Sequence, residues 1–356
     1  MSNRPEDTSL PGALARVPAG VPTPLSDVLA RPLTDLRLSV IDNCNLRCGY
    51  CMPRDMFGDD YPFLSPEVLL SVDEIERLVT LFAGLGVTTV RLTGGEPLLR
   101  PDLPEVIARI ATIPGIRDIG LSTNGFHLAT QATQLRWAGL RRVTVSLDSL
   151  DDATRRRITG GNIAVERILE SIDAAVEAGF DPVKINVVVQ RGVNDGEILD
   201  MVSRFRRPVF HLRFIEYMDV GNSNGWTRAQ IVPSAEIREL LNRHYDLEPV
   251  DPARRGEVAR RYRHADGQGE IGLISSVTEP FCTDCTRARI SADGNLYTCL
   301  FSARGTDLRG LLRTGASDAE IVETITSAWT NRDDRYSEVR GEIEDFEKIE
   351  MFRMGG

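Results

Sequence analysis

Short apolar, β-branched runs alternate with longer amphipathic segments over the first 220 residues of the chain. Such runs predict buried strands, and apolar residues that recur every three or four positions predict helices. The predicted strands are residues 36–41, 87–92, 116–121, 142–147, 183–189 and 211–216. The predicted helices are residues 71–84, 102–112, 130–138, 165–178 and 196–205. This alternation indicates the α/β class, and six βα units fit a partial (βα)6 TIM-like barrel better than a complete eightfold barrel.

The same pattern divides the chain into three parts. Residues 1–31 are rich in Pro and in small or polar side chains, which predicts a flexible N-terminal tail. Residues 32–220 hold the six βα units of the barrel. From residue 221 a Gly- and Asn-rich stretch leads into shorter predicted elements, which indicates a C-terminal extension over residues 221–356 that packs onto the barrel. A chain of 356 residues is long enough for one large domain and one smaller domain.

Composition excludes several classes of function. The net charge of −10 opposes binding to nucleic acid through its phosphate backbone. No run of about 20 apolar residues predicts a membrane span, and the N-terminus lacks the basic start and apolar stretch of an export signal. We therefore expect a cytoplasmic protein, in which clustered thiols are metal ligands rather than disulfides.

All six cysteines lie in two groups of three. They are Cys44, Cys48 and Cys51, spaced C-x3-C-x2-C, and Cys282, Cys285 and Cys299, spaced C-x2-C-x13-C. Three thiolates are one fewer than the four that complete a tetrahedral zinc site or fully ligate a four-iron cluster, so each group leaves an open position for chemistry. A zinc site completed by His or Asp is the alternative, but none of the four histidines lies within 70 residues of the first group.

Basic side chains interrupt the apolar runs of four predicted strands. They are Arg37, Arg91, Lys184 and Arg213. A buried cation needs a partner, and a triphosphate inside the barrel would supply several partners at once. The alternative is ordinary ion pairing with Asp35, Glu96 or Glu216.

Other charged residues carry less information. Arg287 and Arg289 lie two apart on a strand-like stretch, so they point to the same side and can bind phosphate or base oxygens. The basic run at residues 155–157 is interpreted as a solvated face. The four histidines lack thiol or carboxylate partners at motif spacing, and we assign them no role.

The segment CNLRCGYC at residues 44–51 resembles the defining motif of the radical S-adenosylmethionine enzymes, and TGGEP at residues 93–97 resembles their GGEP motif. The resemblance implies a four-iron, four-sulfur ([4Fe-4S]) cluster on the first three cysteines, whose fourth iron chelates S-adenosylmethionine. A glycine pair lets the backbone approach this ligand closely, and the Glu96 carboxylate would pair with its ammonium group.

Further segments resemble one family of this group, the GTP 3′,8-cyclases or molybdenum cofactor biosynthesis proteins A. The segments are PLTDLR at 32–37, CMP at 51–53, STNG at 122–125, SLDS at 146–149, KINV at 184–187, FIEYM at 214–218, CTRAR at 285–289 and the terminal GG. The resemblance covers about residues 30–356. It implies a second [4Fe-4S] cluster on Cys282, Cys285 and Cys299 that contacts guanine, and a Gly-Gly end that reaches into the active site.

The same resemblance implies roles for individual residues. The positions that match S-adenosylmethionine contacts are Tyr50, Gly95, Ser146 and Met218. The positions that match GTP contacts are Arg37, Arg91, Ser122, Lys184, Arg287, Ala288 and Arg289. Arg287 and Arg289 are also the candidate catalytic residues, because their charge would assist reduction of a purine radical. Asn124 and Arg213 lie on the same rim without an assigned role.

The function that the resemblance implies is the first step of molybdenum cofactor biosynthesis. A 5′-deoxyadenosyl radical would take the C3′ hydrogen of GTP, and ring closure at C8 would give (8S)-3′,8-cyclo-7,8-dihydroguanosine 5′-triphosphate. The expected partners are an electron donor such as flavodoxin or ferredoxin, the next enzyme of the pathway and a second copy of the chain in a homodimer. The alternatives are another radical enzyme with an auxiliary cluster, such as a peptide maturase, and a zinc-binding module without catalysis.

The metal content separates the two iron–sulfur enzyme classes from the zinc-binding module. We expect protein purified without oxygen to be brown and to contain iron and sulfide, because three-cysteine groups with an open position suit iron–sulfur clusters. Colourless protein with stoichiometric zinc, measured by elemental analysis, would contradict the enzyme interpretation.

Overall fold

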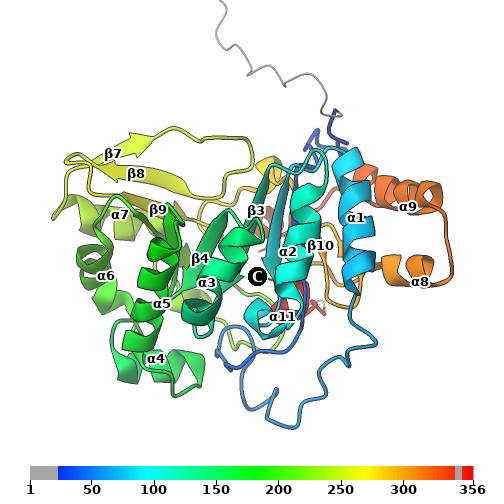
Figure 1. Ribbon diagram of the computed structural model, residues 1–356. Coiled ribbons are helices and arrows are strands. Elements are labelled where there is room, and N and C mark those ends of the chain that lie inside the picture. The colour runs from blue at the N-terminus through cyan, green and yellow to red at the C-terminus, as the bar shows by residue number, and fades with distance from the viewer. Residues whose placement is uncertain (1–22, 341–346, 356) are drawn as a thin grey trace, which may run out of the picture.

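The computed structural model describes residues 23–340 and 347–355. One twisted sheet of twelve strands runs through this part of the chain in the order β12-β11-β10-β1-β2-β3-β4-β5-β6-β9-β8-β7. Figure 1 shows α1, α2, α3 and α5 in front of this sheet and the β7–β8 hairpin at its upper edge.

All six predicted strands are confirmed, each within two residues at either end. They are β1 (Asp35–Ser39), β2 (Thr89–Thr93), β3 (Asp118–Thr123), β4 (Arg142–Ser146), β5 (Val183–Val189) and β6 (Phe210–Glu216). They pair in parallel in chain order. The structure is therefore a mixed α/β fold with a parallel sheet, consistent with a partial barrel that carries a C-terminal domain.

The predicted helices are confirmed as well. They are α1 (Val72–Gly84), α2 (Leu103–Thr112), α3 (Leu128–Trp137), α5 (Val165–Glu177) and α6 (Ile198–Phe205). Ser71 and Glu74 form a capping box that satisfies free backbone N–H groups at the start of α1. The apolar stripe of each helix packs into one large core together with one face of the parallel strands, and alternate strand residues face the other side.

Within the barrel part of the chain, one α-helix was not predicted. Helix α4 (Asp152–Thr159) begins at Asp151, whose side chain accepts a hydrogen bond from the backbone N–H of Thr154. The interpretation of residues 155–157 as a solvated face is wrong for Arg155, which is 2% exposed and donates to the carbonyl oxygen of Ile163.

The C-terminal extension joins the sheet at both of its edges. Strand β9 (Glu270–Ile274) pairs in parallel with β6, and β10 (Arg287–Ile290) pairs in parallel with β1. The antiparallel strands β7 (Leu247–Val250), β8 (Arg260–His264), β11 (Asn295–Tyr297) and β12 (Thr306–Asp307) lie beyond them. The helices of this part are α7 (Ser234–Asn242), α8 (Leu308–Arg313), α9 (Asp318–Thr330), α10 (Tyr336–Val339) and α11 (Met351–Met354). The extension therefore does more than pack onto the barrel, because it continues the barrel sheet.

The predicted N-terminal tail is wrong for its last residues. Asp27 and Arg31 are buried, and the backbone N–H of Leu25 donates to the carbonyl oxygen of Leu85 at the end of α1. These residues are fixed because their charged groups find buried partners in the C-terminal extension. Residues 1–22 of the predicted tail lie outside the described residues.

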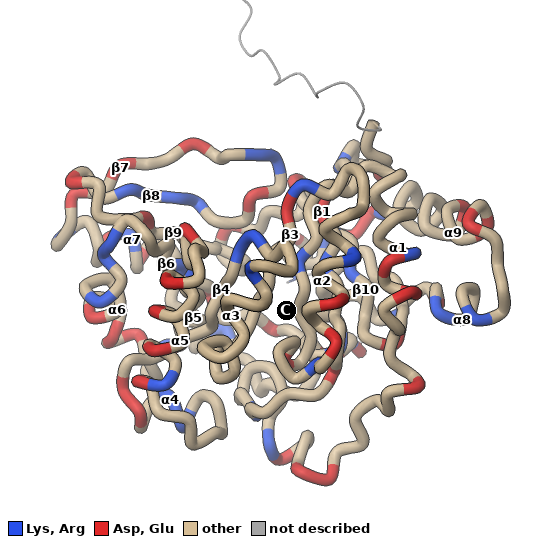
Figure 2. Tube along the Cα trace, viewed as in Figure 1, with Lys and Arg blue, Asp and Glu red and all other residues tan. Residues whose placement is uncertain are grey.

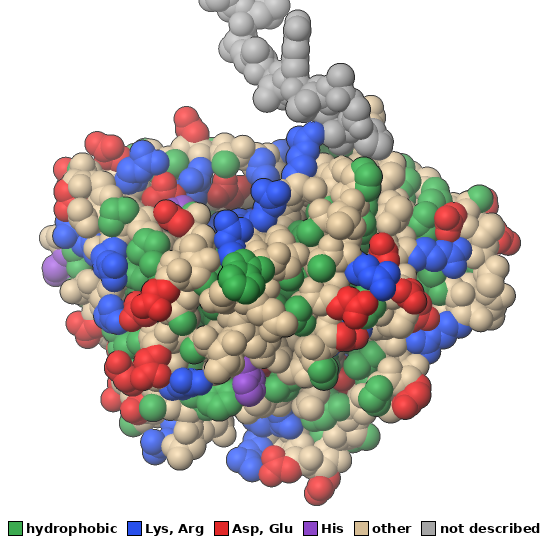
Figure 3. Space-filling view, in the orientation of Figure 1, with side chains coloured by type: hydrophobic (Ala, Val, Ile, Leu, Met, Phe, Trp, Pro, Cys, Tyr) green, Lys and Arg blue, Asp and Glu red, His purple; other side chains and the backbone are tan. Residues whose placement is uncertain are grey.

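Charge is distributed unevenly over the fold. Lys and Arg positions follow β8 and the strand ends beside it in Figure 2. Figure 3 shows their side chains gathered in the upper middle of this face, beside the β7–β8 hairpin. Across residues 23–340 and 347–355, no helix has both the length and the apolar character to cross a membrane.

Candidate active site

The first cysteine group lies on the loop that follows β1, at the carboxyl end of the parallel strands. Cys44 and Cys51 pack against a small apolar cluster of Met52, Phe57 and Phe352. Burial raises the pKa of the Cys44 thiol to about 11 and also raises the pKa values of Cys48 and Cys51. Three partly buried thiols beside one another suit a metal centre, whose positive charge would compensate their loss of protons.

The turn after β2 fits closely against this cysteine loop. A Cβ atom on Gly94 would lie 2.3 Å from the carbonyl oxygen of Ile41, and one on Gly95 would lie 2.2 Å from that of Asn43. Gly94 also has a φ of +154°. Two backbone hydrogen bonds, from Gly95 to Ile41 and from Glu96 to Asn43, join the turn to the loop. The glycine pair is thus required by close backbone approach.

The carboxylate of Glu96 is occupied by its own chain. It accepts hydrogen bonds from the Thr123 hydroxyl and from the backbone N–H groups of Asn124 and Leu98. Burial raises its pKa to about 7. Glu96 therefore connects the turn after β2 to the end of β3. This structural role was not predicted, because the sequence pointed only to pairing of the carboxylate with an ammonium group.

Hydrogen bonds to a second buried carboxylate hold Tyr50 at the same end of the sheet. Its hydroxyl donates to the Asp148 carboxylate at 2.9 Å, and the backbone N–H of Val188 donates to the other oxygen at 2.8 Å. Asp148 is 4% exposed and lies just beyond β4. The aromatic side chain between Cys48 and Cys51 is therefore anchored to β4 and β5.

A cavity of about 350 Å³ occupies the space enclosed by the strands. Nine basic residues line it: Arg37, Arg91, Arg142, Lys184, Arg213, Arg254, Arg261, Arg287 and Arg289. The acidic residues in its wall are Asp35, Glu257 and Glu270. This excess of positive charge in a chain of net charge −10 indicates an anionic ligand.

Strand register accounts for the concentration of charge. Arg37 on β1 has Arg289 of β10 as its partner on one side and Arg91 of β2 on the other. Residues in register on neighbouring strands face the same side of a sheet, so three guanidinium groups lie next to one another.

Two of the cations share one hydroxyl group. Arg91 Nη1 donates to Thr144 Oγ1 at 3.2 Å, and Arg213 Nη2 donates to the same oxygen at 3.3 Å. Arg91 Nη1 also donates to Ser122 Oγ at 3.3 Å. A hydroxyl oxygen has two acceptor lone pairs, so Thr144 can hold both arginines in position.

Six of the nine basic residues form no ion pair with a carboxylate of the described residues. They are Arg37, Arg91, Lys184, Arg213, Arg287 and Arg289, whereas Arg142, Arg254 and Arg261 pair with carboxylates. The alternative of ordinary ion pairing is therefore wrong for the four basic strand residues. Asp35 pairs with Arg254, and Glu216 accepts hydrogen bonds from the backbone N–H groups of Ser234, Val277 and Thr278.

One histidine lies in the cavity wall. His211 Nε2 is 3.6 Å from Glu270 Oε2, so this residue has a carboxylate neighbour that its sequence spacing did not reveal. Burial lowers its pKa to about 4.

The second cysteine group lies at the opposite end of the sheet from the first. Cys282 and Cys285 precede β10, which runs parallel to β1, so they are at the amino end of the strands. Cys299 follows β11, which is antiparallel to β10, and so returns to the same end. Cys285 and Cys299 both line the cavity.

Arg287 is in direct contact with this group. Its Nη2 atom donates to Cys285 Sγ at 3.3 Å. Burial acts to raise the pKa of the Cys285 thiol, but the charges of Arg287 and Arg332 outweigh it and lower this pKa to about 6. A thiol that favours the thiolate form is suited to bind metal.

Among the described residues, no three His, Cys, Asp or Glu side chains converge on a single ion-sized point. Cysteines that hold a four-iron cluster bind different irons, so they need not converge in this way. Both cysteine groups supply the thiolate ligands that such clusters use.

The described C-terminal residues close the cavity near the first cysteine group. Met351 lines the cavity, and Phe352 packs against the apolar cluster beside Cys44. The carbonyl oxygen of Gly355 accepts a hydrogen bond from Arg289 Nη1 at 2.5 Å. A Cβ atom on Gly355 would lie 1.8 Å from Thr93 Oγ1. Gly356 lies outside the described residues.

The expected site residues separate into two sets. Tyr50, Gly95, Ser146 and Met218 lie at the carboxyl ends of strands or just beyond them, and Met218 also lines the cavity. Arg37, Arg91, Ser122, Lys184, Arg287 and Arg289 line the cavity. Ala288 is fully buried in the core and does not line the cavity, because alternate residues of β10 face opposite sides. Asn124 donates to Asn45 on the first cysteine loop, and Arg213 lies in the cavity.

Several residues of the cavity were missed in the sequence. Arg142 and Thr144 lie two residues apart on β4 and face the cavity with Arg91. Side chains alternate between the two faces of a strand, and this two-residue period would have revealed both residues in the sequence. Arg254 and Arg261 come from the segment before β8 and from β8 itself, and no local pattern points to them.

Comparisons with known proteins match both halves of the chain. Residues 38–205 match the family described as the radical SAM superfamily, and residues 210–338 match the family described as Molybdenum Cofactor Synthesis C. The GTP 3′,8-cyclase of Acidothermus cellulolyticus is 50% identical over 342 residues, which cover 94% of this chain and 94% of that protein. The GTP 3′,8-cyclase of Xanthomonas axonopodis pv. citri is 52% identical over 334 residues, which cover 94% of this chain and 99% of that protein.

A solved structure shows a similar fold. Streptococcus suis SuiB bound to S-adenosylmethionine aligns with a TM-score of 0.57 at 15% identity, over 87% of this chain and 68% of that chain. At this identity the likeness concerns the fold alone.

The charge in the cavity predicts a proton change on anion binding. Burial, together with the charges of Arg213, Arg142 and Arg91, lowers the pKa of Lys184 from 10.5 to about 7. At pH 8 the free amine is therefore mostly neutral, and a bound anion raises its pKa again, so binding takes up a proton. We expect the protein to take up more protons per tripolyphosphate bound than a Lys184→Gln variant does, measured by calorimetry in buffers of different ionisation enthalpy. At pH 6 the difference should vanish, and an equal uptake by both proteins at pH 8 would contradict the assignment.

Proposed function

Because the chain belongs to the GTP 3′,8-cyclase family of radical S-adenosylmethionine enzymes, we propose that GTP binds in its basic cavity between the two cysteine groups. The activity of this family is the cyclisation of GTP in molybdenum cofactor biosynthesis. The product proposed for this chain is (8S)-3′,8-cyclo-7,8-dihydroguanosine 5′-triphosphate. Membership of this family overturns both alternatives, the zinc-binding module without catalysis and the peptide maturase.

The observation that carries the proposal is the set of six cations without carboxylate partners around the cavity. Arg91 and Arg213 are held by Thr144, with Arg37 and Lys184 on the neighbouring strands. A triphosphate supplies the negative charge that these groups lack, and guanidinium groups bind phosphate oxygens in pairs. Bound phosphates would thereby fix the position of the ribose, which is what an intramolecular cyclisation requires.

The guanine base belongs, in this proposal, at the end of the cavity formed by Cys285 and Cys299. Three cysteine ligands leave one iron of a four-iron cluster open, and an open iron can accept a purine nitrogen or oxygen. Arg287 and Arg289 lie on β10 beside this position. Their charges favour the addition of an electron to the purine, which supports their role as catalytic residues.

The proposed reaction balances as an isomerisation of GTP. The C3′–H bond breaks and its hydrogen leaves in 5′-deoxyadenosine, a bond forms between C3′ and C8, and one electron and one proton are added to the purine. Cleavage of S-adenosylmethionine to methionine and 5′-deoxyadenosine would consume a second electron, and a flavodoxin- or ferredoxin-type donor would supply both electrons. When bound, the first cluster and S-adenosylmethionine supply the one-electron chemistry that removes the C3′ hydrogen. The protein positions the substrate, excludes water and keeps the purine beside positive charge.

The residues around the first cysteine group support binding of S-adenosylmethionine there. Gly94 and Gly95 let the turn after β2 pack directly against the cysteine loop, and Asp148 fixes the ring of Tyr50 beside the cysteines. We assign Tyr50, Gly95, Ser146 and Met218 to this ligand. The homodimer, the electron donor, the transfer of product to the next enzyme and the cytoplasmic location remain predictions.

Loss of one cysteine from the second group should stop formation of the cyclised nucleotide while 5′-deoxyadenosine is still formed. We expect a Cys299→Ala variant, incubated without oxygen with GTP, S-adenosylmethionine and dithionite, to form 5′-deoxyadenosine but almost no cyclised nucleotide. A Cys44→Ala control should form neither compound. Cyclised nucleotide from Cys299→Ala at the rate of the unmodified protein, measured by mass spectrometry, would show that the second group does not hold the substrate.

We expect Thr144 to contribute to the affinity for the phosphates of GTP and not to the affinity for the nucleoside. A Thr144→Val change keeps the shape of the side chain but removes the oxygen that holds Arg91 and Arg213, so we expect the Kd for GTP to rise about 5- to 10-fold, the value of one to two hydrogen bonds. The affinity for guanosine should stay unchanged, and Thr144→Ser should restore GTP binding. Equal losses for GTP and guanosine in calorimetry would contradict this role.

A further inference from the structure

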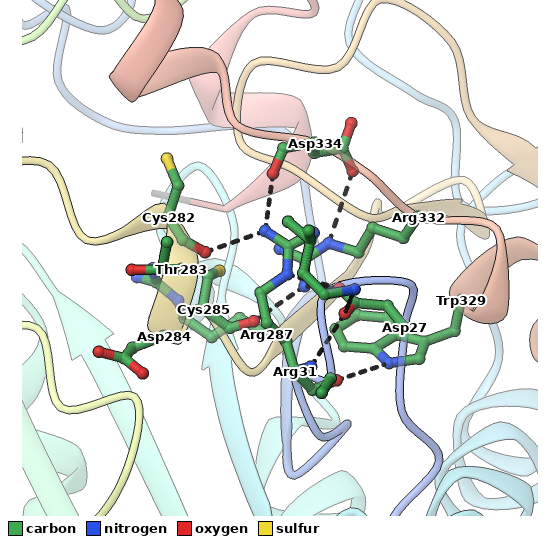
Figure 4. A network of polar contacts seen from close by, with 12 residues as sticks. Asp27, Arg31, Cys282, Thr283, Asp284, Cys285, Arg287, Trp329, Arg332 and Asp334 are labelled. Carbon is green, nitrogen blue, oxygen red and sulfur yellow. Dashed lines mark hydrogen bonds and ion pairs between the residues drawn. The ribbon is translucent and has the colours of Figure 1, made fainter.

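Three buried charged side chains meet behind the second cysteine group (Figure 4). Asp27 and Arg31 come from the segment before β1, and Arg332 comes from the segment after α9. The side chains of Asp27 and Arg31 are 0% exposed, and that of Arg332 is 1% exposed. We call these three residues the Asp27 brace.

The Asp27 carboxylate joins the two arginines. Its Oδ2 atom accepts hydrogen bonds from Arg31 Nε at 2.5 Å and from Arg332 Nη1 at 3.2 Å. Its Oδ1 atom accepts the backbone N–H of Arg31 at 2.9 Å. Trp329 supports the arrangement from one side, because the Arg332 guanidinium lies 4.5 Å from the centre of its ring and its Nε1 donates to the Arg31 carbonyl oxygen.

Each arginine then reaches the backbone of one cysteine. Arg31 Nη1 donates to the carbonyl oxygen of Cys282 at 2.9 Å, and Arg332 Nη1 donates to that of Cys285 at 2.8 Å. Arg31 Nη1 also donates to the carbonyl oxygen of Asp334. A single carboxylate thus fixes, through two guanidinium groups, the positions of two cysteines of the second group.

The charges of the brace do not balance on their own. Two fully buried cations share one buried carboxylate, and the further carboxylate near Arg332, that of Asp334, is 30% exposed. Arg31 Nη2 is buried and has no hydrogen-bond partner within the described part of the chain. Buried positive charge is costly without a counter-charge, and a cluster held by three thiolates brings negative charge to this place.

We propose that Asp27, Arg31 and Arg332 are positioning residues that set the spacing of Cys282 and Cys285 and thereby retain the second cluster. The proposal rests on the second cluster of the proposed function. Partners outside the ligand set commonly determine how tightly a metal site is held. The N-terminal segment is on this account a part of the metal site and not a tail.

The test compares iron loss from full-length protein that carries both clusters. We expect Arg31→Gln and Arg332→Gln to lose the second cluster to a chelator about 10- to 100-fold faster than the unmodified protein. The first cluster, followed by the change of its electron paramagnetic resonance signal on addition of S-adenosylmethionine, should be lost at the original rate. Equal loss rates for the second cluster in variant and unmodified protein would overturn the proposal.

Arg255 provides a matched control. It pairs with Asp284, between the same two cysteines, and donates to the Ala30 carbonyl oxygen, but its side chain is 49% exposed and it makes no bond to a cysteine. Arg255→Gln should therefore lose iron at the unmodified rate. A loss as fast as that of Arg332→Gln would mean that any disturbance of this segment releases the cluster, and would overturn the specific role of the brace.

A second measurement separates a positioning role from general stability. Removing one cation should shift the reduction potential of the second cluster to more negative values, whereas Arg332→Lys keeps the charge and should change the loss rate without this shift. If the glutamine variants do not fold, the lysine variants carry the loss-rate test, and unchanged loss rates in them would overturn the proposal. Unmodified protein that binds only one cluster would overturn the proposed function and the brace with it.

Discussion

Repulsion among arginines at one level of the sheet is the constraint on which the rest of the structure depends. Arg289, Arg37 and Arg91 are register partners on three adjacent strands, and like charges in such positions destabilise a sheet. The apolar core around the strands has to outweigh this repulsion, and Gly120 on β3 leaves room beside the Arg91 guanidinium. The cavity is thus the place where the fold is least stable, and an anion bound there would offset the repulsion.

The sequence predicted the barrel because its strands and helices are local patterns. All six strands of the barrel were found, since one face of each packs in the apolar core and β-branched or other apolar residues dominate each run. Helix α4 was missed because its segment is polar, with Arg155 buried among its charged neighbours. The pairing of β9 and β10 with the edges of the barrel was missed as well, because short strands give weak signals and their partners lie far away in the chain.

The residues of the candidate site that belong to sequence motifs could be predicted. Both cysteine groups and the cations of the strands were named, and the structure brings most of them to one cavity. The arrangement of the two groups at opposite ends of the sheet follows from the direction of β10, which no motif reveals. Asp27 and Arg31 were assigned to a flexible tail from the composition of the segment around them. Composition does not reveal distant partners, and Arg31 donates hydrogen bonds to residues 251 and 303 positions away in the chain.

The enclosed cavity also has a consequence for selection among phosphates. In a cell, most phosphate groups belong to RNA and DNA, which would compete for any exposed row of arginines. Here the unpaired cations line a space of about 350 Å³, and the chain as a whole carries a net charge of −10. The net negative charge of the chain repels a nucleic-acid polymer, while the enclosed cations stay available to a small anion. Enclosure of the cations thus favours monomeric phosphates over polymeric ones.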